Sequence, residues 1–273
     1  MKTPLPWRQE IDSLEKAYAH QIAAFSFLDY KSDIETIKSE WLIKQIDLAF
    51  EAWQNNIYTR EYPFEMFCEF ILPYRFKEGI ILEDSKEMFY KRHHTIFKDS
   101  VGASFIQRID SILYYYKDIR YNFFAGDRIP INSVKTFEQI KYGQCGDRSW
   151  FNSLVLASSG IASSIDFAPS QGNRNNSHTW NAIITPSQTI PFEPFWDEDR
   201  WKYKIMYNNK TTDRKWGKLR FAKVYRNTFS INKTGPLFDP NISKEDIPNL
   251  FKNPRIKDVS NEYFDTTNVN ILI

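Results

Sequence analysis

The sequence predicts an α+β protein in which helices come first and a sheet follows. Before about residue 130, apolar side chains recur every three or four positions over long stretches, which is the spacing of amphipathic helices. After about residue 160, the apolar runs become short, and Gly, Pro, Asn and Ser gather between them, as in strands joined by turns. Helices and strands do not alternate, so the order is that of an α+β fold rather than of a parallel α/β sheet.

The helices of the first half follow from this spacing. We expect them over Glu10–Leu28, Asp33–Trp53, Glu83–Lys98, Ser104–Phe124 and Ser133–Ile140. Ser32 or Asp33 is expected to cap the second of these, because both side chains accept hydrogen bonds from a first helical turn. A shorter helical segment should begin at Pro63 and stop at Pro73, since proline fits the first turn of a helix and cannot continue one.

The second half begins with one more helix and continues as strands. The helix runs from about Cys145 to Ser158, after a break at Gly143, and Gly160 is expected to end it in the left-handed conformation. Strands are expected over four apolar runs: Ile161–Phe167, Thr179–Ile184, Thr189–Phe192 and Leu219–Tyr225. The turn sequence TPSQT between the second and third runs fits a hairpin. A last run, Asn268–Ile273, looks like the start of a further strand.

Composition and charge argue against several kinds of partner. Lys and Arg number 36 against 34 Asp and Glu, and the charges are interspersed, so there is no basic stripe for nucleic acid or for a charged membrane surface. No run of 18 apolar residues occurs, so no membrane span is expected. The first residues lack the apolar stretch of a signal peptide. Cys68 and Cys145 lie too far apart in sequence, and are too few, for a zinc quartet.

The stretch Tyr142–Ile183 carries the residues with the most reactive chemistry. Cys145 stands at the expected start of a helix, where unpaired N–H groups and the helix dipole favour a thiolate over the ordinary thiol with its pKa of about 8.5. Gly143 and Gly146 on either side let the backbone come close to a substrate. The same N–H groups can stabilise an oxyanion. By itself, a lone cysteine is more often a buried structural thiol, and Cys68 is expected to be one.

An imidazole and a carboxylate follow the thiol in the chain. His178 begins an expected strand, and Glu193 ends the next one, so the predicted hairpin would place the two side by side. Glu193 could then accept a hydrogen bond from His178 and fix its tautomer. This order predicts Cys145 as nucleophile, His178 as base and Glu193 as the orienting acid. Asp197, Glu198 or Asp199 could take the place of Glu193, although a solvated acidic loop is the expected role of these three.

Four further residues are candidates for binding substrate or an oxyanion: Gln144, Gly146, Tyr142 and Trp180. Gln144, Trp180 and Tyr142 each have a plainer alternative, which for Tyr142 is an ordinary exposed loop. The amide of Gln144 could donate to an oxyanion or only satisfy a turn, and Trp180 could wall a cleft or pack under His178. His93 and His94 are expected at the surface, because neighbouring residues on a helix point about 100° apart and do not share a ligand. No metal site and no organic cofactor are expected.

These residues resemble the transglutaminase-like superfamily of papain-fold cysteine enzymes, and in particular its bacterial peptidase-like members. The pattern appears here as Gly143 and Cys145, Gly160 and Ile161, His178 and Trp180, and Glu193 and Pro194, within about Phe137–Phe229. Three positions depart from it: Glu193 stands where Asp is usual, Arg148 and Trp150 stand where small residues are usual, and Ala162 stands where proline is common. The segments LPYR and AKVYRNTFS also resemble parts of large bacterial surface proteins.

The resemblance implies a core in which the cysteine helix packs on an antiparallel sheet carrying the histidine and the acid. It implies a helical N-terminal region over 1–130, a catalytic core over 131–235, and a C-terminal extension over 236–273 that leads to further β-sandwich modules. The implied activity is thiol-dependent acyl transfer on a peptide or protein substrate, hydrolysis rather than cross-linking, in an exported or cell-surface protein. The alternatives are a catalytically weak binding or scaffold module and an aromatic surface that binds carbohydrate or peptide.

Overall fold

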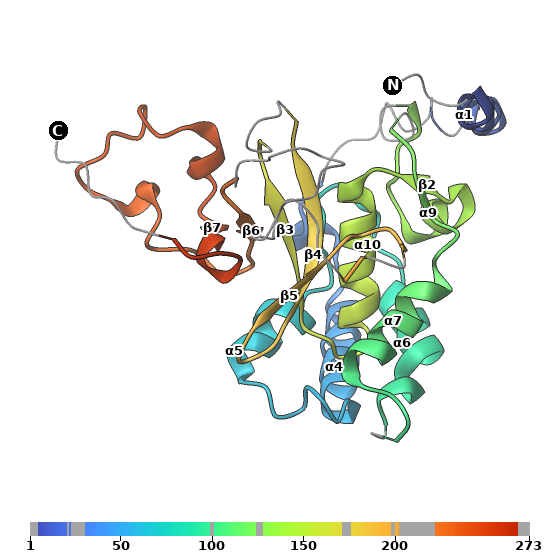
Figure 1. Ribbon diagram of the computed structural model, residues 1–273, viewed down its shortest axis with the longest axis horizontal. Coiled ribbons are helices and arrows are strands. Elements are labelled where there is room, and N and C mark those ends of the chain that lie inside the picture. The colour runs from blue at the N-terminus through green and yellow to red at the C-terminus, as the bar shows by residue number, and fades with distance from the viewer. Residues whose placement is uncertain are drawn as a thin grey trace. The chain divides into compact units, whose positions relative to one another are not determined.

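The computed structural model describes residues 5–20, 22, 31–98, 101–123, 128–170, 176–197, 200–201 and 222–266. The chain divides into two compact units, one made of Met1–Ile161 with Pro194–Trp196 and the other of Ala162–Glu193 with Asp197–Ile273. The first unit is mostly helical and the second holds an antiparallel sheet, which confirms the predicted α+β class (Figure 1). The division at residues 130 and 235 stays a prediction. Within the described residues, we find no helix with the length and hydrophobicity that crossing a membrane requires.

The first unit contains helices at most of the predicted places. Its helical segments are α1 (Leu5–Ala17), α3 (Asp33–Thr36), α4 (Ser39–Asn55), α5 (Phe64–Met66), the π-helix η1 (Phe67–Ile71), α6 (Ser85–His93), the 3₁₀ helix η2 (His94–Phe97), α7 (Phe105–Tyr115), α9 (Val134–Ile140) and α10 (Cys145–Ala157). Two short strands, β1 (Arg120–Tyr121) and β2 (Tyr142–Gly143), pair in parallel. Of the predicted helix Glu10–Leu28, residues 21 and 23–28 lie outside the described residues.

Two predicted helices are wrong in their extent. The helix predicted over Asp33–Trp53 breaks at Ile37, whose backbone is extended, and the short α3 is held apart because Asp33 accepts hydrogen bonds from Tyr74 and Arg75. The helix predicted over Ser104–Phe124 begins with the capping box of Ser104 but ends at Tyr115. Tertiary contacts override the apolar spacing there, since the chain after α7 leaves the helix to pair as β1 with β2.

Helix α10 lies at the centre of the aromatic core of the first unit. All its residues from Asp147 to Ala157 are buried. Phe151 makes edge-to-face contacts with Phe89, Tyr116 and Phe137, at centroid distances of 5.5, 5.0 and 5.3 Å. A helix buried on every side is held by tertiary packing more than by its own propensity. The thiol therefore begins a helix with little freedom to move.

The far end of α10 is fixed by Gly160, as predicted. Gly160 has a φ of 71°, and a Cβ there would lie 2.2 Å from the carbonyl oxygen of Ala52. The loop after α4 completes this end, because the side chains of Asn56 and Thr59 donate to the carbonyls of Ser159 and Gly160 at 2.9 and 2.6 Å. Only glycine fits both the left-handed backbone and the close approach of Ala52.

The second unit is built on a five-stranded antiparallel sheet with the strand order β5-β4-β3-β6-β7. The strands are β3 (Ser163–Ala168), β4 (His178–Ile184), β5 (Thr189–Phe192), β6 (Tyr225–Asn227) and β7 (Ile256–Asp258), and the 3₁₀ helices are η3 (Pro236–Phe238), η4 (Asn249–Lys252) and η5 (Ser260–Glu262). The predicted hairpin of β4 and β5 is confirmed. The predicted run Asn268–Ile273 lies outside the described residues, as does the Leu219–Phe221 part of another run.

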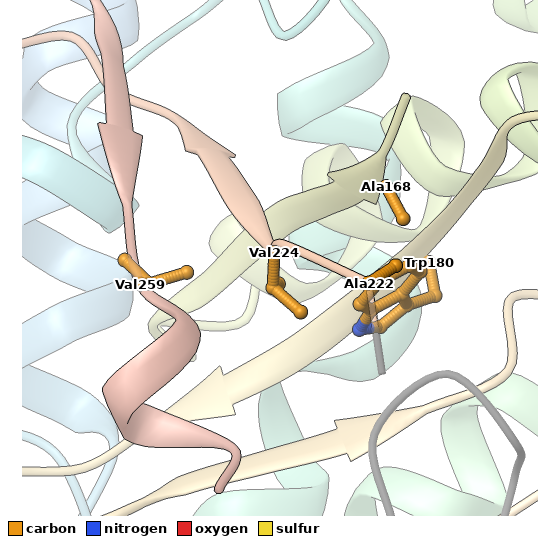
Figure 2. Close-up of a cluster of buried hydrophobic side chains, with 5 residues drawn as sticks. All are labelled: Ala168, Trp180, Ala222, Val224 and Val259. Carbon is orange, nitrogen blue, oxygen red and sulfur yellow. The ribbon is translucent and has the colours of Figure 1, made fainter. Parts of the chain in front are cut away.

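One face of this sheet carries both His178 and Trp180, because alternate residues of a strand share a face. The register places His178 opposite Ala168, and Trp180 opposite Asp166, which in turn lies opposite Arg226. Trp180 belongs to a buried cluster whose other members are Ala168, Ala222, Val224 and Val259 (Figure 2). Tyr263 and Phe264 pack against this cluster, so residues well beyond the predicted core help to cover this face.

Candidate active site

Cys145 is the first residue of α10 and is partly buried. The helix start is fixed by the residues around it. The backbone N–H of Gln144 donates to Asp147 Oδ2 at 3.0 Å, and Lys77 Nζ donates to Asp147 Oδ1 at 2.8 Å. The Asp147 side chain therefore holds the first turn, so the N–H groups and the dipole at the thiol point in a fixed direction.

The two glycines beside the thiol differ in their surroundings. A Cβ on Gly143 would lie 2.7 Å from the ring of Phe137, so the chain needs glycine there. A Cβ on Gly146 would meet no atom within 4 Å, so there is open space beside the first turn of α10. The first unit thus leaves room next to this turn for another molecule to approach.

Tyr121 lies close to Cys145 and is not among the site residues predicted from the sequence. Tyr121 pairs with Gly143 between β1 and β2, and its pKa is raised by burial and then by the negative charge of Cys145. Its ring packs edge-to-face on Phe195 at 5.7 Å, and 44% of the residue is exposed. The only signal for Tyr121 in the sequence is the alternation of aromatic residues at Tyr121 and Phe123, which is typical of a strand. The stretch before it continues the spacing of a helix.

Gln144 and Tyr142 are both hydrogen-bonded within the first unit. Gln144 Nε2 donates to the carbonyl of Phe123 at 2.9 Å, which satisfies a loop. The Tyr142 hydroxyl donates to Glu10, and the pKa of Tyr142 is raised by burial and then by this carboxylate. Their predicted roles in binding substrate or an oxyanion stay predictions.

His178 and Glu193 are joined in the second unit. His178 begins β4 and Glu193 directly follows β5, and His178 Nε2 lies 2.9 Å from Glu193 Oε2. The side chains are 21% and 18% exposed, so water screens this pair only in part. The His178 ring stacks on Trp180 at a centroid distance of 5.6 Å, and Trp180 is fully buried. Packing under His178 is thus the role that the structure gives to Trp180.

Helix α10 also binds the residue that follows Glu193 in the chain. Arg148 Nε and Asn152 Nδ2 donate to the carbonyl of Pro194 at 3.2 and 2.8 Å, and Arg148 Nη1 donates to the carbonyl of Tyr116 at 3.0 Å. Both side chains are fully buried. In the sequence, Arg148 stands out only as a departure from the family pattern. Two polar residues four positions apart on an apolar helix were the available signal.

His93 and Cys68 are two other residues whose position was predicted from the sequence, and both are at least partly buried. His93 is 3% exposed, so its predicted surface position is wrong; it is hydrogen-bonded to the Tyr116 hydroxyl at 2.8 Å. Cys68 is partly buried in η1, and its pKa is raised by burial and then by Glu65 and Glu69.

Of the acids that could replace Glu193, Asp197 is exposed, and Glu198 and Asp199 lie outside the described residues. Among the residues that are described, no three His, Cys, Asp or Glu side chains gather as metal ligands.

Comparison with known proteins finds one weak structural likeness. No protein-family model matches the sequence, and no curated protein matches it significantly. Among solved structures, a similar chain is described as a putative cysteine protease from Cytophaga hutchinsonii; it is 12% identical, with a TM-score of 0.36. The match covers 53% of this chain and 46% of that one. A likeness this weak decides neither family nor function, so the resemblance to transglutaminase-like enzymes stays a prediction.

Proposed function

We propose that the protein is a thiol-dependent acyl-transfer enzyme that hydrolyses peptide or amide bonds. Cys145 is the nucleophile, His178 the general base and acid, and Glu193 the residue that orients His178. The observation that carries the proposal is the 2.9 Å hydrogen bond between His178 and Glu193. An imidazole held by a partly buried carboxylate is the base that a nucleophile of this kind requires.

In the proposed reaction, Glu193 accepts a hydrogen bond from the Nε2–H group of His178, so Nδ1 is free of a proton and takes one from Cys145 Sγ. The sulfur attacks the carbonyl carbon of the substrate, and N–H groups of the first turn of α10 stabilise the oxyanion. The C–N bond then breaks as His178 returns the proton to the leaving amine, which leaves a thioester. Water, deprotonated by His178, attacks the thioester, and the carboxylic acid leaves as the thiol is restored.

Two features of the first unit support this role for Cys145. The thiol begins a 13-residue helix whose first turn is capped, where a negative charge is stabilised. The second is the bonding of α10 to Pro194: Arg148 and Asn152 hold the carbonyl of the residue that is joined covalently to Glu193. Pro194 is therefore held within the first unit by the helix that begins with the proposed nucleophile.

The test is the reactivity of the two thiols. Iodoacetamide alkylation is followed by mass spectrometry from about pH 5 to 10 in the wild type, Cys145→Ala and Cys68→Ala. Cys145 is expected to react at least tenfold faster than Cys68 at neutral pH, with a midpoint below about 8.5. Cys68 is a matched slow control, because its pKa is raised. Equal rates and ordinary midpoints would overturn the enzyme proposal and favour a binding module.

A thiol-reactive peptide probe extends this test to acyl transfer. A peptide with an electrophilic carbonyl derivative at its C-terminus should label the wild type and Cys68→Ala, and not Cys145→Ala. His178→Ala should slow labelling by a factor of about 100 or more, because a positioned base contributes that much. If the rate of labelling is the same in His178→Ala as in the wild type, Cys145 is a reactive thiol without a catalytic base.

A further inference from the structure

The C-terminal segment of the second unit reaches the proposed base through one tyrosine. The Tyr263 hydroxyl donates to Asp166 Oδ2 at 2.5 Å and accepts from Trp180 Nε1 at 3.0 Å. The Trp180 ring in turn stacks on His178. Tyr263 lies 83 residues after Trp180 and just past η5, in the segment predicted as an extension rather than as part of the core.

The anchor of Tyr263 is a buried ion pair. Asp166 is fully buried, and Arg226 donates to both of its oxygens at 2.8 Å from Nε and Nη2. Arg226 also reaches Glu262 at 2.8 Å, and Glu262 accepts from Thr189 at 2.6 Å. Burial disfavours the charge of Arg226, but Asp166 outweighs it and raises the pKa of Arg226 above its usual range. A fully hydrogen-bonded network of this kind holds its members in one geometry.

The group between Trp180 and Asp166 must both accept and donate a hydrogen bond. The indole N–H of Trp180 can only donate, and Asp166 as an anion can only accept, so the group between them must do both. Burial, and then Asp166, raise the pKa of Tyr263 well above its usual value, so the phenol keeps its proton. The ion pair stabilises the sheet, and Tyr263 connects it through Trp180 to the ring of His178.

We propose that Tyr263 is a positioning residue for His178: anchored on Asp166 and Arg226, it fixes the Trp180 ring against which the imidazole stacks. Glu193 then holds one ring nitrogen while Trp180 holds the plane of the ring. Effective proton transfer depends on this orientation, since small displacements of a reacting group cost large factors in rate. The inference rests on the proposed role of His178 as the base.

The test is Tyr263→Phe in the full chain, with Tyr74→Phe as a matched control. Tyr74 also donates its hydroxyl to an aspartate that is paired with an arginine, but in the first unit and on residues that the proposed reaction does not use. Two readouts are compared: the rate of labelling by the peptide probe as a function of pH, and NMR spectra of the histidine rings and the tryptophan N–H groups. Signals are assigned with His178→Ala and Trp180→Phe.

Tyr263→Phe is expected to slow labelling about tenfold, to shift the Trp180 N–H signal upfield, and to change the His178 ring signals, while Tyr74→Phe does none of these. Unchanged His178 signals in Tyr263→Phe would overturn the positioning role, even if stability falls. Unchanged labelling would overturn it as well. If the wild type itself is not labelled at Cys145, the proposed function fails, and the NMR comparison still decides whether Tyr263 holds His178.

A second variant tests the same link in case the Tyr263→Phe protein does not fold. Trp180→Phe keeps an aromatic ring beside His178 but removes the N–H that donates to Tyr263. It should slow labelling by a similar factor, and the double variant should lose little more than either single one, because both changes break the same link. Fully additive losses would show that the two residues act separately and would overturn the proposal.

Discussion

At the scale of single residues, the proposed function depends on the pair of His178 and Glu193. Glutamate stands where the resembling family has aspartate, and its longer side chain still reaches the imidazole at 2.9 Å. Both groups are partly buried, so the carboxylate can stabilise the imidazolium that the proposed reaction would form.

Glu193→Gln is expected to slow labelling of Cys145 by about 10- to 100-fold, less than His178→Ala, because the amide keeps the hydrogen-bonding shape but loses the charge. The rate of probe labelling measures this, with Asp197→Asn as the control, since Asp197 is an exposed acid four residues further on. If Asp197→Asn slows labelling and Glu193→Gln does not, the orienting role belongs to Asp197.

His93 supplies a separate prediction on stability. Burial, and then Arg92, lower the pKa of His93 to about 4. An unfolded histidine titrates near 6.5, so the unfolded chain takes up the proton first as pH falls. Stability from the neutral ring is full above about pH 6.5 and should be lost as pH falls towards 4, by up to about 3 kcal/mol. Urea unfolding between pH 4 and 7 should show a flatter profile in His93→Gln; equal slopes would contradict this.

At the scale of elements, α10 is fixed differently at its two ends. At its C-terminal end, the left-handed Gly160 lies against the backbone of Ala52. At its N-terminal end, a capping interaction holds the turn and Gly146 faces open space. At the C-terminal end a Cβ on the glycine would collide with the backbone, whereas at the N-terminal end a Cβ on the glycine would meet no neighbouring atom.

Exchanging each glycine for alanine separates these roles. Gly160→Ala should lower the free energy of unfolding by more than about 1–2 kcal/mol, since a Cβ would collide with the Ala52 carbonyl on a left-handed backbone. Gly146→Ala should leave stability unchanged or raise it by up to about 1 kcal/mol. Chemical denaturation of both variants measures the difference. Equal losses in the two would mean that the first turn is also tightly packed.

At the scale of the whole molecule, the second unit is held together by residues from both ends of its sequence. Asp166 on β3 is neutralised by Arg226 on β6 and bonded by Tyr263 after η5. Strand β7 completes the sheet beside β6. The predicted catalytic core over 131–235 lacks both β7 and Tyr263.

A chain ended after Gly235 tests that predicted boundary. It should lose several kcal/mol of stability in the second unit, because Asp166 and Arg226 lose Tyr263 and Glu262, and the cluster around Trp180 loses its cover. Hydrogen exchange in β3, β4 and β6, compared with the full chain, reports this loss. Unchanged protection would show that the core does end near residue 235.

The sequence by itself determined what depends on neighbouring residues. Apolar spacing located most helices and strands, Gly160 marked the end of α10, and the turn TPSQT predicted the hairpin that brings His178 and Glu193 together. These are local effects of backbone geometry and side-chain period, which a single sequence records directly.

The tertiary structure alone decided what depends on distant residues. Four features have no counterpart in the apolar spacing of the sequence. They are the break between α3 and α4, the end of α7 at Tyr115, the bonds from α10 to Pro194, and the link of Tyr263 to Trp180. Each is a contact between groups far apart in the chain, and its free energy depends on burial and hydrogen bonding that exist only once the chain has packed.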